Sequence, residues 1–178
     1  MIWESEHWKE PLLRLASKLV RWRKPREWTE RELVSIEKDI FVAFYSIRKL
    51  MDAKKLSDAT EVMPVKVSIY PSKGKAVTIY NWDKIDKLYD LAVKNLSQRD
   101  LRFICNQIIH SYVFIPDIDK NGSFQAILFC SDRERNANLF GIEADDLINA
   151  LRIVGKDYPA ESESVFNPKK QDYDVTNG

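Results

Sequence analysis

The segment 30-ERELVSIEKDIFVAFYSIRKLMDAK-54 decides the fold, because it carries the strongest periodic pattern in this sequence of 178 residues. Apolar residues recur in it at steps of three and four, the spacing of one face of an α-helix. These positions are Leu33, Ile36, Ile40, Phe44, Ile47 and Met51. Thr29 and Glu32 have the spacing of a capping box. The pattern predicts a central core helix over residues 30–54.

Three other segments have helical periodicity. Residues 10–24 carry one apolar and one basic side, with Pro11 near the first turn. Residues 98–112 follow cap-like residues and have an apolar side rich in leucine and isoleucine. Residues 144–154 end at Gly155, in the position where glycine commonly ends a helix. A shorter helix is expected after Asp83.

The remaining pattern predicts strands, because apolar and polar residues alternate. We expect a hairpin of residues 65–69 and 77–79, strands over 113–118 and 124–130, and a short strand at 140–142. The fold class is therefore α+β, a core of about four helices with a small antiparallel β-sheet. We expect one domain over residues 1–159 and a disordered tail over residues 160–178, where polar residues and glycine dominate.

The composition narrows the classes of function. The formal net charge is only +1, so any attraction to nucleic acid must come from a local basic patch. No apolar run approaches the roughly 20 residues that span a bilayer, so we expect no membrane span. The first residues lack the cationic segment and apolar core of a secretion signal, which favours a cytoplasmic location.

Neither a metal nor a cofactor is expected. Cys105 and Cys130 lie in apolar contexts without CxxC spacing, which predicts two buried thiols rather than a disulfide or a zinc site. The chain has only five glycines and no phosphate-cradling loop. Residues 117–123 copy the first half of a calcium loop, but Leu128 occupies the twelfth position, where calcium needs an acid. This segment is therefore predicted to be an Asx-rich turn.

Arg102, Asn106 and His110 are the candidate site residues, four residues apart in succession on the helix predicted over 98–112. Residues at this spacing lean toward one flank of a helix. An imidazole beside an amide and a guanidinium is a chemically usable group. The alternative is that His110 is a structural group at the end of a packed helix, bonded to a nearby carbonyl or hydroxyl.

The stretch from Cys105 to His110 resembles the signature helix of the HEPN superfamily (higher eukaryotes and prokaryotes nucleotide-binding). In that family an arginine, usually followed by a polar residue, precedes a histidine by four to six intervening residues. His110 matches the histidine and Asn106 the polar residue, while Cys105 stands at the arginine position. The resemblance implies metal-independent RNA cleavage in a cleft between two copies, or an inactive relative retained for binding or assembly, in a toxin–antitoxin or defence setting.

In such a site the histidine would manage proton transfer from the ribose 2′-OH and an arginine would steady the phosphate. Arg102 or Arg48 would have to supply the guanidinium that Cys105 does not. The loop after Cys130 could also present Arg133 or Arg135 to a ligand.

The first helix offers a second surface for an anionic partner. Its basic residues are interleaved with tryptophans, a combination that suits phosphate chains but also an ordinary solvated face. The candidate nucleic-acid-binding residues on this helix are Arg14, Lys18, Arg21 and Arg23. Three classes of function thus stay open: an RNA-acting HEPN-like protein, a non-enzymatic protein-interaction module, and an anion or nucleic-acid binder. Aromatic-rich surfaces also favour a homodimer.

Overall fold

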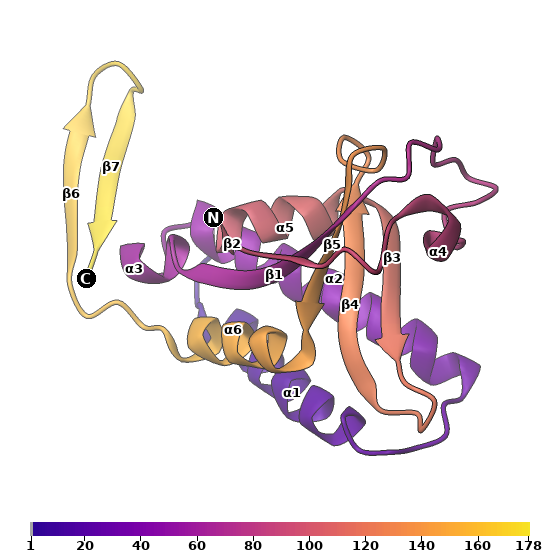
Figure 1. Cartoon of the computed structure of the whole chain (residues 1–178). Helices are drawn as coiled ribbons and strands as arrows, with labels where there is room; N and C mark the ends of the chain where they lie inside the picture. Colours follow the sequence, from indigo (N-terminus) through magenta and orange to yellow (C-terminus); the bar gives the residue numbers. More distant parts are fainter. Residues whose placement is uncertain (1) are drawn as a thin grey trace.

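The computed structural model describes residues 2–178 and places helices against a five-stranded sheet (Figure 1). The helices are α1 (Glu6–Trp22), α2 (Glu30–Asp52), α3 (Asp58–Glu61), α4 (Ile85–Leu88), α5 (Leu101–Ile109) and α6 (Ala144–Lys156). The strands are β1 (Pro64–Pro71), β2 (Asn95–Asp100), β3 (Ser111–Ile118), β4 (Phe124–Ser131), β5 (Asn138–Glu143), β6 (Ser162–Asn167) and β7 (Asp172–Asn177). The predicted α+β class is confirmed.

The sheet has the order β2-β1-β5-β4-β3, and all of its neighbouring strands are antiparallel. Register places Phe140, Phe129 and Phe114 in one row across β5, β4 and β3, so their side chains share a face. Phe103 of α5 packs on Phe140 with ring centroids 5.3 Å apart. Phe41 of α2 packs on Phe114 at 4.9 Å. Helices α2 and α5 therefore pack on this face, and the buried sides of α1 and α6 belong to the same hydrophobic core.

The long connection between β1 and β2 covers the opposite face of the sheet around Cys130, whereas a shallow pocket at Ser68 and Gly141 leaves another part of that face open. Cys130 follows Phe129 on β4 and thus faces the other way. The buried hydroxyl of Tyr89 lies 3.4 Å from the Cys130 sulfur and donates a hydrogen bond to the Arg135 carbonyl at 2.5 Å. Burial raises the pKa of the Tyr89 hydroxyl, which therefore stays protonated as a donor.

Helix α2 confirms the prediction closely, because its start is determined by local chemistry. The Glu32 amide donates to the Thr29 hydroxyl at 3.3 Å, and the Thr29 amide donates to the Glu32 carboxylate at 3.0 Å. This is the capping box that the sequence predicts. Helix α1 begins four residues earlier than predicted, at Glu6, and includes Pro11 in its interior.

Two predictions around β1 are wrong. Residues 77–79 do not form the second strand of a hairpin; β1 pairs with β2 and β5 instead. Residues 98–100 belong to β2 rather than to the helix, which begins at Leu101. Asp100 is its N-cap, and its carboxylate accepts a hydrogen bond from the Phe103 amide at 2.6 Å. Pairing between distant strands thus overrides the local helical pattern of these residues.

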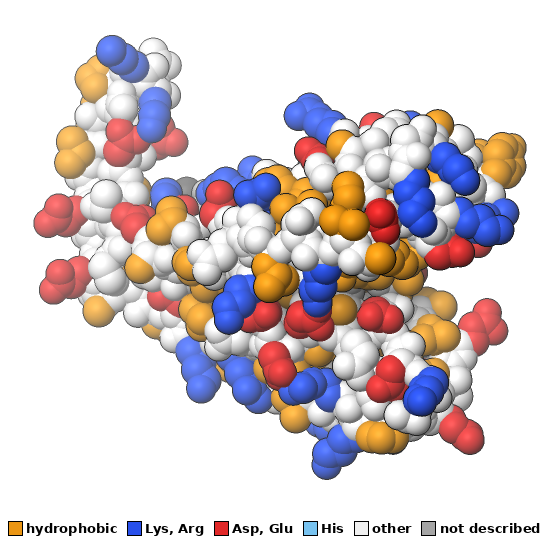
Figure 2. Space-filling view, in the orientation of Figure 1, with side chains coloured by type: hydrophobic (Ala, Val, Ile, Leu, Met, Phe, Trp, Pro, Cys, Tyr) orange, Lys and Arg blue, Asp and Glu red, His pale blue; other side chains and the backbone are white. Residues whose placement is uncertain are grey.

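The C-terminal residues, which composition predicts to be disordered, form the antiparallel hairpin β6–β7. We call this hairpin the arm, and it stands away from the sheet and helices (Figures 1 and 2). Its end is attached by the Asn177 side-chain amide, which donates to the Lys54 and Leu56 carbonyls at 3.1 and 2.9 Å. The rings of Phe166 and Tyr173 pack on each other, and both side chains are exposed.

Among residues 2–178, no helix combines the length and the apolar character needed to cross a membrane.

Candidate functional site

His110 lies at the C-terminal end of α5, directly before β3, and its side chain is exposed. The backbone amide of His110 donates to the Asn106 carbonyl at 3.2 Å, which closes the last turn of the helix. The buried side of α5 consists of Leu101, Ile104, Cys105, Gln107 and Ile108. The apolar residues of this side hold α5 against the core, so the imidazole projects from a firmly packed element.

The imidazole borders a cavity of about 600 Å³ between α2, α5 and the start of the loop after β4. We call it the His110 cavity. It is lined by Arg48, Phe103, Asn106, Gln107, His110, Ser131, Asp132 and Arg133. Ser131 is fixed there because its amide donates to the Gln107 side-chain oxygen at 2.9 Å.

Two guanidinium groups give this cavity positive charge. Arg48 reaches it from α2, where its Nε donates to the Asp52 carboxylate at 3.0 Å and its Nη1 donates to the Asn106 side-chain oxygen. Arg133 comes from the loop after β4, is exposed, and has no ion pair within residues 2–178. Asp132 brings one carboxylate to the rim, which pairs with Arg135 at 3.2 Å. The site can therefore offer an anion several guanidinium donors beside one imidazole.

Arg102 does not join His110, although both lie on α5. The Arg102 guanidinium pairs with Asp52 at 3.3 Å and with Glu61 at 3.5 Å, and it does not line the His110 cavity. Eight residues of helix rise about 12 Å, so these two side chains start too far apart to meet at one phosphate. The structure brings His110, Asn106 and Arg48 together and leaves Arg102 outside.

Cys105 lies in the core and not in the cavity. Its side chain has no exposed surface. Burial raises the pKa of the thiol to about 12, although the nearby guanidinium groups of Arg48 and Arg102 act against this shift. Position 105 therefore holds a neutral, enclosed group that cannot contact a phosphate.

The hydroxyl of Ser131 is a feature of the cavity that sequence reasoning missed. This hydroxyl is buried and, within the described part of the chain, makes no hydrogen bond. The same is true of the Ser111 hydroxyl. Buried polar atoms almost always have a partner, so the Ser131 hydroxyl is an exception in the fold, but protein atoms enclose it and it offers no surface to a ligand in the cavity. No local pattern in the sequence distinguishes Ser131, because its position depends on the contact with Gln107.

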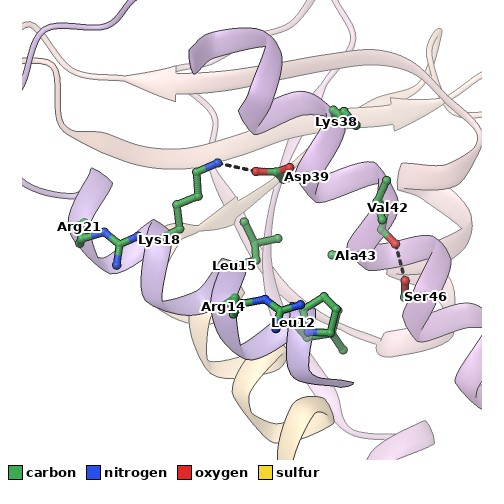
Figure 3. A pocket seen from close by; sticks show the side chains of 11 residues that line it. Leu12, Arg14, Leu15, Lys18, Arg21, Lys38, Asp39, Val42, Ala43 and Ser46 are labelled. Atoms are coloured by element: carbon green, nitrogen blue, oxygen red, sulfur yellow. Dashed lines mark hydrogen bonds and ion pairs between the residues drawn. The ribbon is translucent and has the colours of Figure 1, made fainter. Parts of the chain in front are cut away.

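A second basic site lies between α1 and α2, and Figure 3 shows it from close by. We call it the α1–α2 groove, and its volume is about 360 Å³. Lys18 reaches across it from α1 to the Asp39 carboxylate, 2.6 Å away. Arg14 pairs with Glu10 along α1. Arg21 also lines the groove, so three of the four basic residues predicted on this helix lie together.

Arg23 departs from this set. Its guanidinium pairs with Asp145 at the start of α6 and does not line the groove. Lys38 of α2 lines the groove in its place. The predicted basic surface contains only residues of the first helix, so it does not include Lys38, which lies on α2.

The turn between β3 and β4 has the geometry of an Asx turn. The Asp119 carboxylate accepts hydrogen bonds from the amides of Asn121 and Ser123 at 2.8 and 2.9 Å. The Trp28 indole donates to the Gly122 carbonyl at 2.7 Å, which fixes the turn against the α1–α2 connection. In the described residues, no group of three or more His, Cys, Asp or Glu side chains is arranged to hold a metal ion.

Comparisons of this chain with protein-family models, with curated proteins and with solved structures found no match.

Proposed function

We propose that this chain is an RNA-acting protein of the HEPN-like type, and that its His110 cavity receives a phosphate of the RNA backbone. One observation carries the proposal: the exposed imidazole of His110 shares one cavity with the guanidinium groups of Arg48 and Arg133. An imidazole changes its charge near neutral pH, and guanidinium groups bind phosphate oxygens with fixed, charge-assisted donors.

In the HEPN pattern, the arginine that binds the phosphate lies on the same helix as the histidine. In this chain we assign that phosphate-binding role to Arg48, which lies on α2 instead. Its hydrogen bond to Asn106 holds the guanidinium one helical turn before His110, roughly 6 Å along the axis. That separation suits a phosphate bound between the two groups. Asn106 is then a positioning residue that orients Arg48.

The chemistry we propose is attack of a ribose 2′-oxygen on the adjacent phosphorus. The 2′-OH proton passes to a ring nitrogen of His110 as the new P–O bond forms, and the bond from phosphorus to the 5′-oxygen breaks. The leaving 5′-oxygen takes a proton from water. Arg48 and Arg133 stabilise the negative charge that accumulates on the phosphate oxygens.

The test measures cleavage and binding separately, with labelled RNA in the presence of a metal chelator. We expect cleavage that persists with chelator and is lost in His110→Ala. The matched control is His7→Ala, since His7 is the other histidine and is also exposed. RNA binding without cleavage, weakened by Arg133→Ala, would assign the chain to the inactive relatives. Absence of both binding and cleavage would refute the proposal.

Two copies of the chain are proposed to associate, in a cytoplasmic, toxin–antitoxin or defence setting. The exposed rings of Phe166 and Tyr173 on the arm support a self-association surface, because a two-stranded hairpin is marginally stable alone. The two free, buried cysteines suit a reducing compartment. A dimer in sedimentation equilibrium that dissociates on Phe166→Ser with Tyr173→Ser is the expected result; a monomeric wild type refutes it.

The arm also favours a second candidate function, a non-enzymatic protein-interaction module. It carries exposed apolar side chains that the rest of its own chain does not cover. If the wild type binds no RNA, and a co-purifying protein is lost when the two aromatic residues of the arm are replaced, this second function is the correct one.

A further inference from the structure

An apolar patch on α2 separates the His110 cavity from the α1–α2 groove. It consists of Phe41, Val42, Tyr45 and Ile109. Val42 and Tyr45 are 53% and 52% exposed, so both side chains are accessible to a ligand. Val42 also lines the groove, and Ile109 directly precedes His110. The patch therefore borders both basic sites.

Helix geometry orders the three sites around α2. At about 100° per residue, Ser46 lies on one side of Tyr45 and Arg48 on the other. Ser46 lines the α1–α2 groove, whereas Arg48 lines the His110 cavity. Tyr45 thus lies on the exposed side of α2, between the α1–α2 groove and the His110 cavity. The width of a helix with its side chains, about 10–12 Å, separates them.

We infer that the cavity, the patch and the groove form one continuous binding surface for single-stranded RNA, with a base stacked on Tyr45 and backbone phosphates in both hollows. This inference rests on the proposed function and adds to it the Tyr45 platform and the groove. In the groove, Arg21 and Lys38 would contact phosphate, since neither forms an ion pair with any residue from 2 to 178.

The alternation of basic and aromatic surface favours single-stranded RNA over double-stranded RNA. Single strands bind where cationic hollows follow the backbone and exposed rings stack on unpaired bases. A duplex keeps its base faces inside the helix, so it cannot stack on Tyr45.

A second copy of this chain is a poorer occupant of the patch. Two copies facing each other here would place Arg21 and Lys38 opposite cations of the partner, beside the Arg48 and Arg133 guanidinium groups. Like charges facing each other across an interface oppose association. A polyanion, in contrast, is attracted to both hollows.

The first experiment examines the platform by fluorescence anisotropy, with a labelled 12-nucleotide single-stranded RNA and a duplex of the same sequence. Tyr45→Ser should weaken single-strand binding by roughly 5- to 150-fold, the range of one base–aromatic stack. The matched control Tyr45→Phe retains the ring and should stay within about twofold of the wild type, an expectation that follows because stacking needs only the π-face. The duplex should bind more weakly than the single strand, with no dependence on position 45.

The second experiment examines the groove. Arg21→Glu with Lys38→Glu should weaken binding by at least about tenfold and reduce the slope of log K against log salt by about 0.7 for each phosphate that the variant no longer neutralises. The control Arg152→Glu makes the same kind of charge change on the exposed side of α6, and it should leave the affinity close to the wild-type value.

The outcomes separate this inference from the proposed function. If Arg133→Ala weakens RNA binding while either the Tyr45→Ser or the groove variant binds like the wild type, the continuous surface is refuted and the proposed function stands. If the wild type binds no RNA, both fall. If Tyr45→Ser instead converts a dimer to a monomer in sedimentation velocity and leaves RNA affinity unchanged, the patch is a contact between copies and the inference is overturned.

Discussion

Replacing Cys105 by arginine tests whether the departure from the HEPN arginine position is structural. The substitution restores the residue type that the resemblance expects, but at a position with no exposed surface. The Arg48 and Arg102 guanidinium groups already lie near the thiol and share the one nearby carboxylate, Asp52, so a third guanidinium would meet two like charges and a carboxylate that is already paired. We therefore expect Cys105→Arg to destabilise the fold rather than to create activity.

The magnitude follows from two costs. Overpacking a filled core costs about 1–3 kcal/mol, and burying an unpaired charge costs several kcal/mol more, even after the structure relaxes. Together these exceed about 4 kcal/mol, a large part of the 5–15 kcal/mol by which native proteins are typically stable. With an m-value of about 2 kcal/mol/M, the urea midpoint should fall by at least about 2 M.

The assay is urea unfolding followed by circular dichroism, with two controls. Cys105→Ala removes only the sulfur and should cost about 1 kcal/mol, as expected for a methyl-sized cavity. Ser17→Arg adds the same charge at an exposed position of α1 and should change stability by no more than about 0.5 kcal/mol. A Cys105→Arg variant as stable as the wild type, with new or increased RNA cleavage, would refute the assignment of the phosphate-binding role to Arg48.

Three further predictions concern the fold. Burial lowers the pKa of the Lys9 ammonium below 10.5, so the folded state binds the Lys9 proton less tightly than the unfolded chain, and the Lys9 contribution to stability should rise with pH up to about 10.5, against the opposite contributions of the buried Cys105 and Tyr89. Lys9→Met should remove that rise in a pH series of urea unfolding, and equal slopes would contradict the reasoning. Gly122 has a φ of +79°, and a Cβ there would strike a backbone carbonyl, so Gly122→Ala should lower the free energy of unfolding by more than about 2 kcal/mol. Gly74→Ala is the control, with φ +75° but open space, and should cost about 1 kcal/mol; equal losses in thermal unfolding would contradict the clash. Asp100→Ala should cost about 1 kcal/mol by removing the α5 cap, whereas Ser97→Ala should be nearly neutral in urea unfolding; the reverse order would place the cap at Ser97.

The elements that the sequence predicts well are those defined by local chemistry. The start of α2 follows from the capping box of Thr29 and Glu32, which needs no distant partner. The strands predicted at 113–118 and 124–130 are confirmed, with β3 two residues longer at its start and β4 one residue longer at its end, because a short Asx turn joins them. The alternation of apolar and polar residues in these strands, and the turn between them, are both determined by a few neighbouring residues.

The wrong predictions come from pairing between distant segments. Residues 95–100 extend as β2 because β1, some 30 residues earlier in the chain, offers a free edge to pair with. The arm is a different case, because β6 and β7 are neighbours in the chain: Val165, Phe166 and Tyr173 occupy strand positions there, but the polar composition of the segment predicts disorder instead. Strand pairing is a tertiary contact, and short segments do not specify which partner is nearest.

The candidate site shows the same limit in a sharper form. The spacing of Arg102, Asn106 and His110 on one predicted helix suggests a single site. Residues on the same side of a helix are nevertheless separated along its axis, by about 1.5 Å per residue. Arg102 and His110 share a flank but lie near opposite ends of α5, and Asp52 and Glu61 hold the Arg102 guanidinium at its end. A motif within one helix cannot show which guanidinium a second helix will bring.

Asp52 links the two possible sources of that guanidinium. It pairs with Arg48 at 3.0 Å and with Arg102 at 3.3 Å, so one carboxylate holds both side chains. Arg48 has the additional bond to Asn106, which draws it toward the His110 cavity, whereas Arg102 has Glu61, which draws it away. The cavity therefore gains its guanidinium only when α2 and α5 pack in this register. Any RNA chemistry at this site must then disappear when α2 and α5 separate, even where α5 itself stays helical.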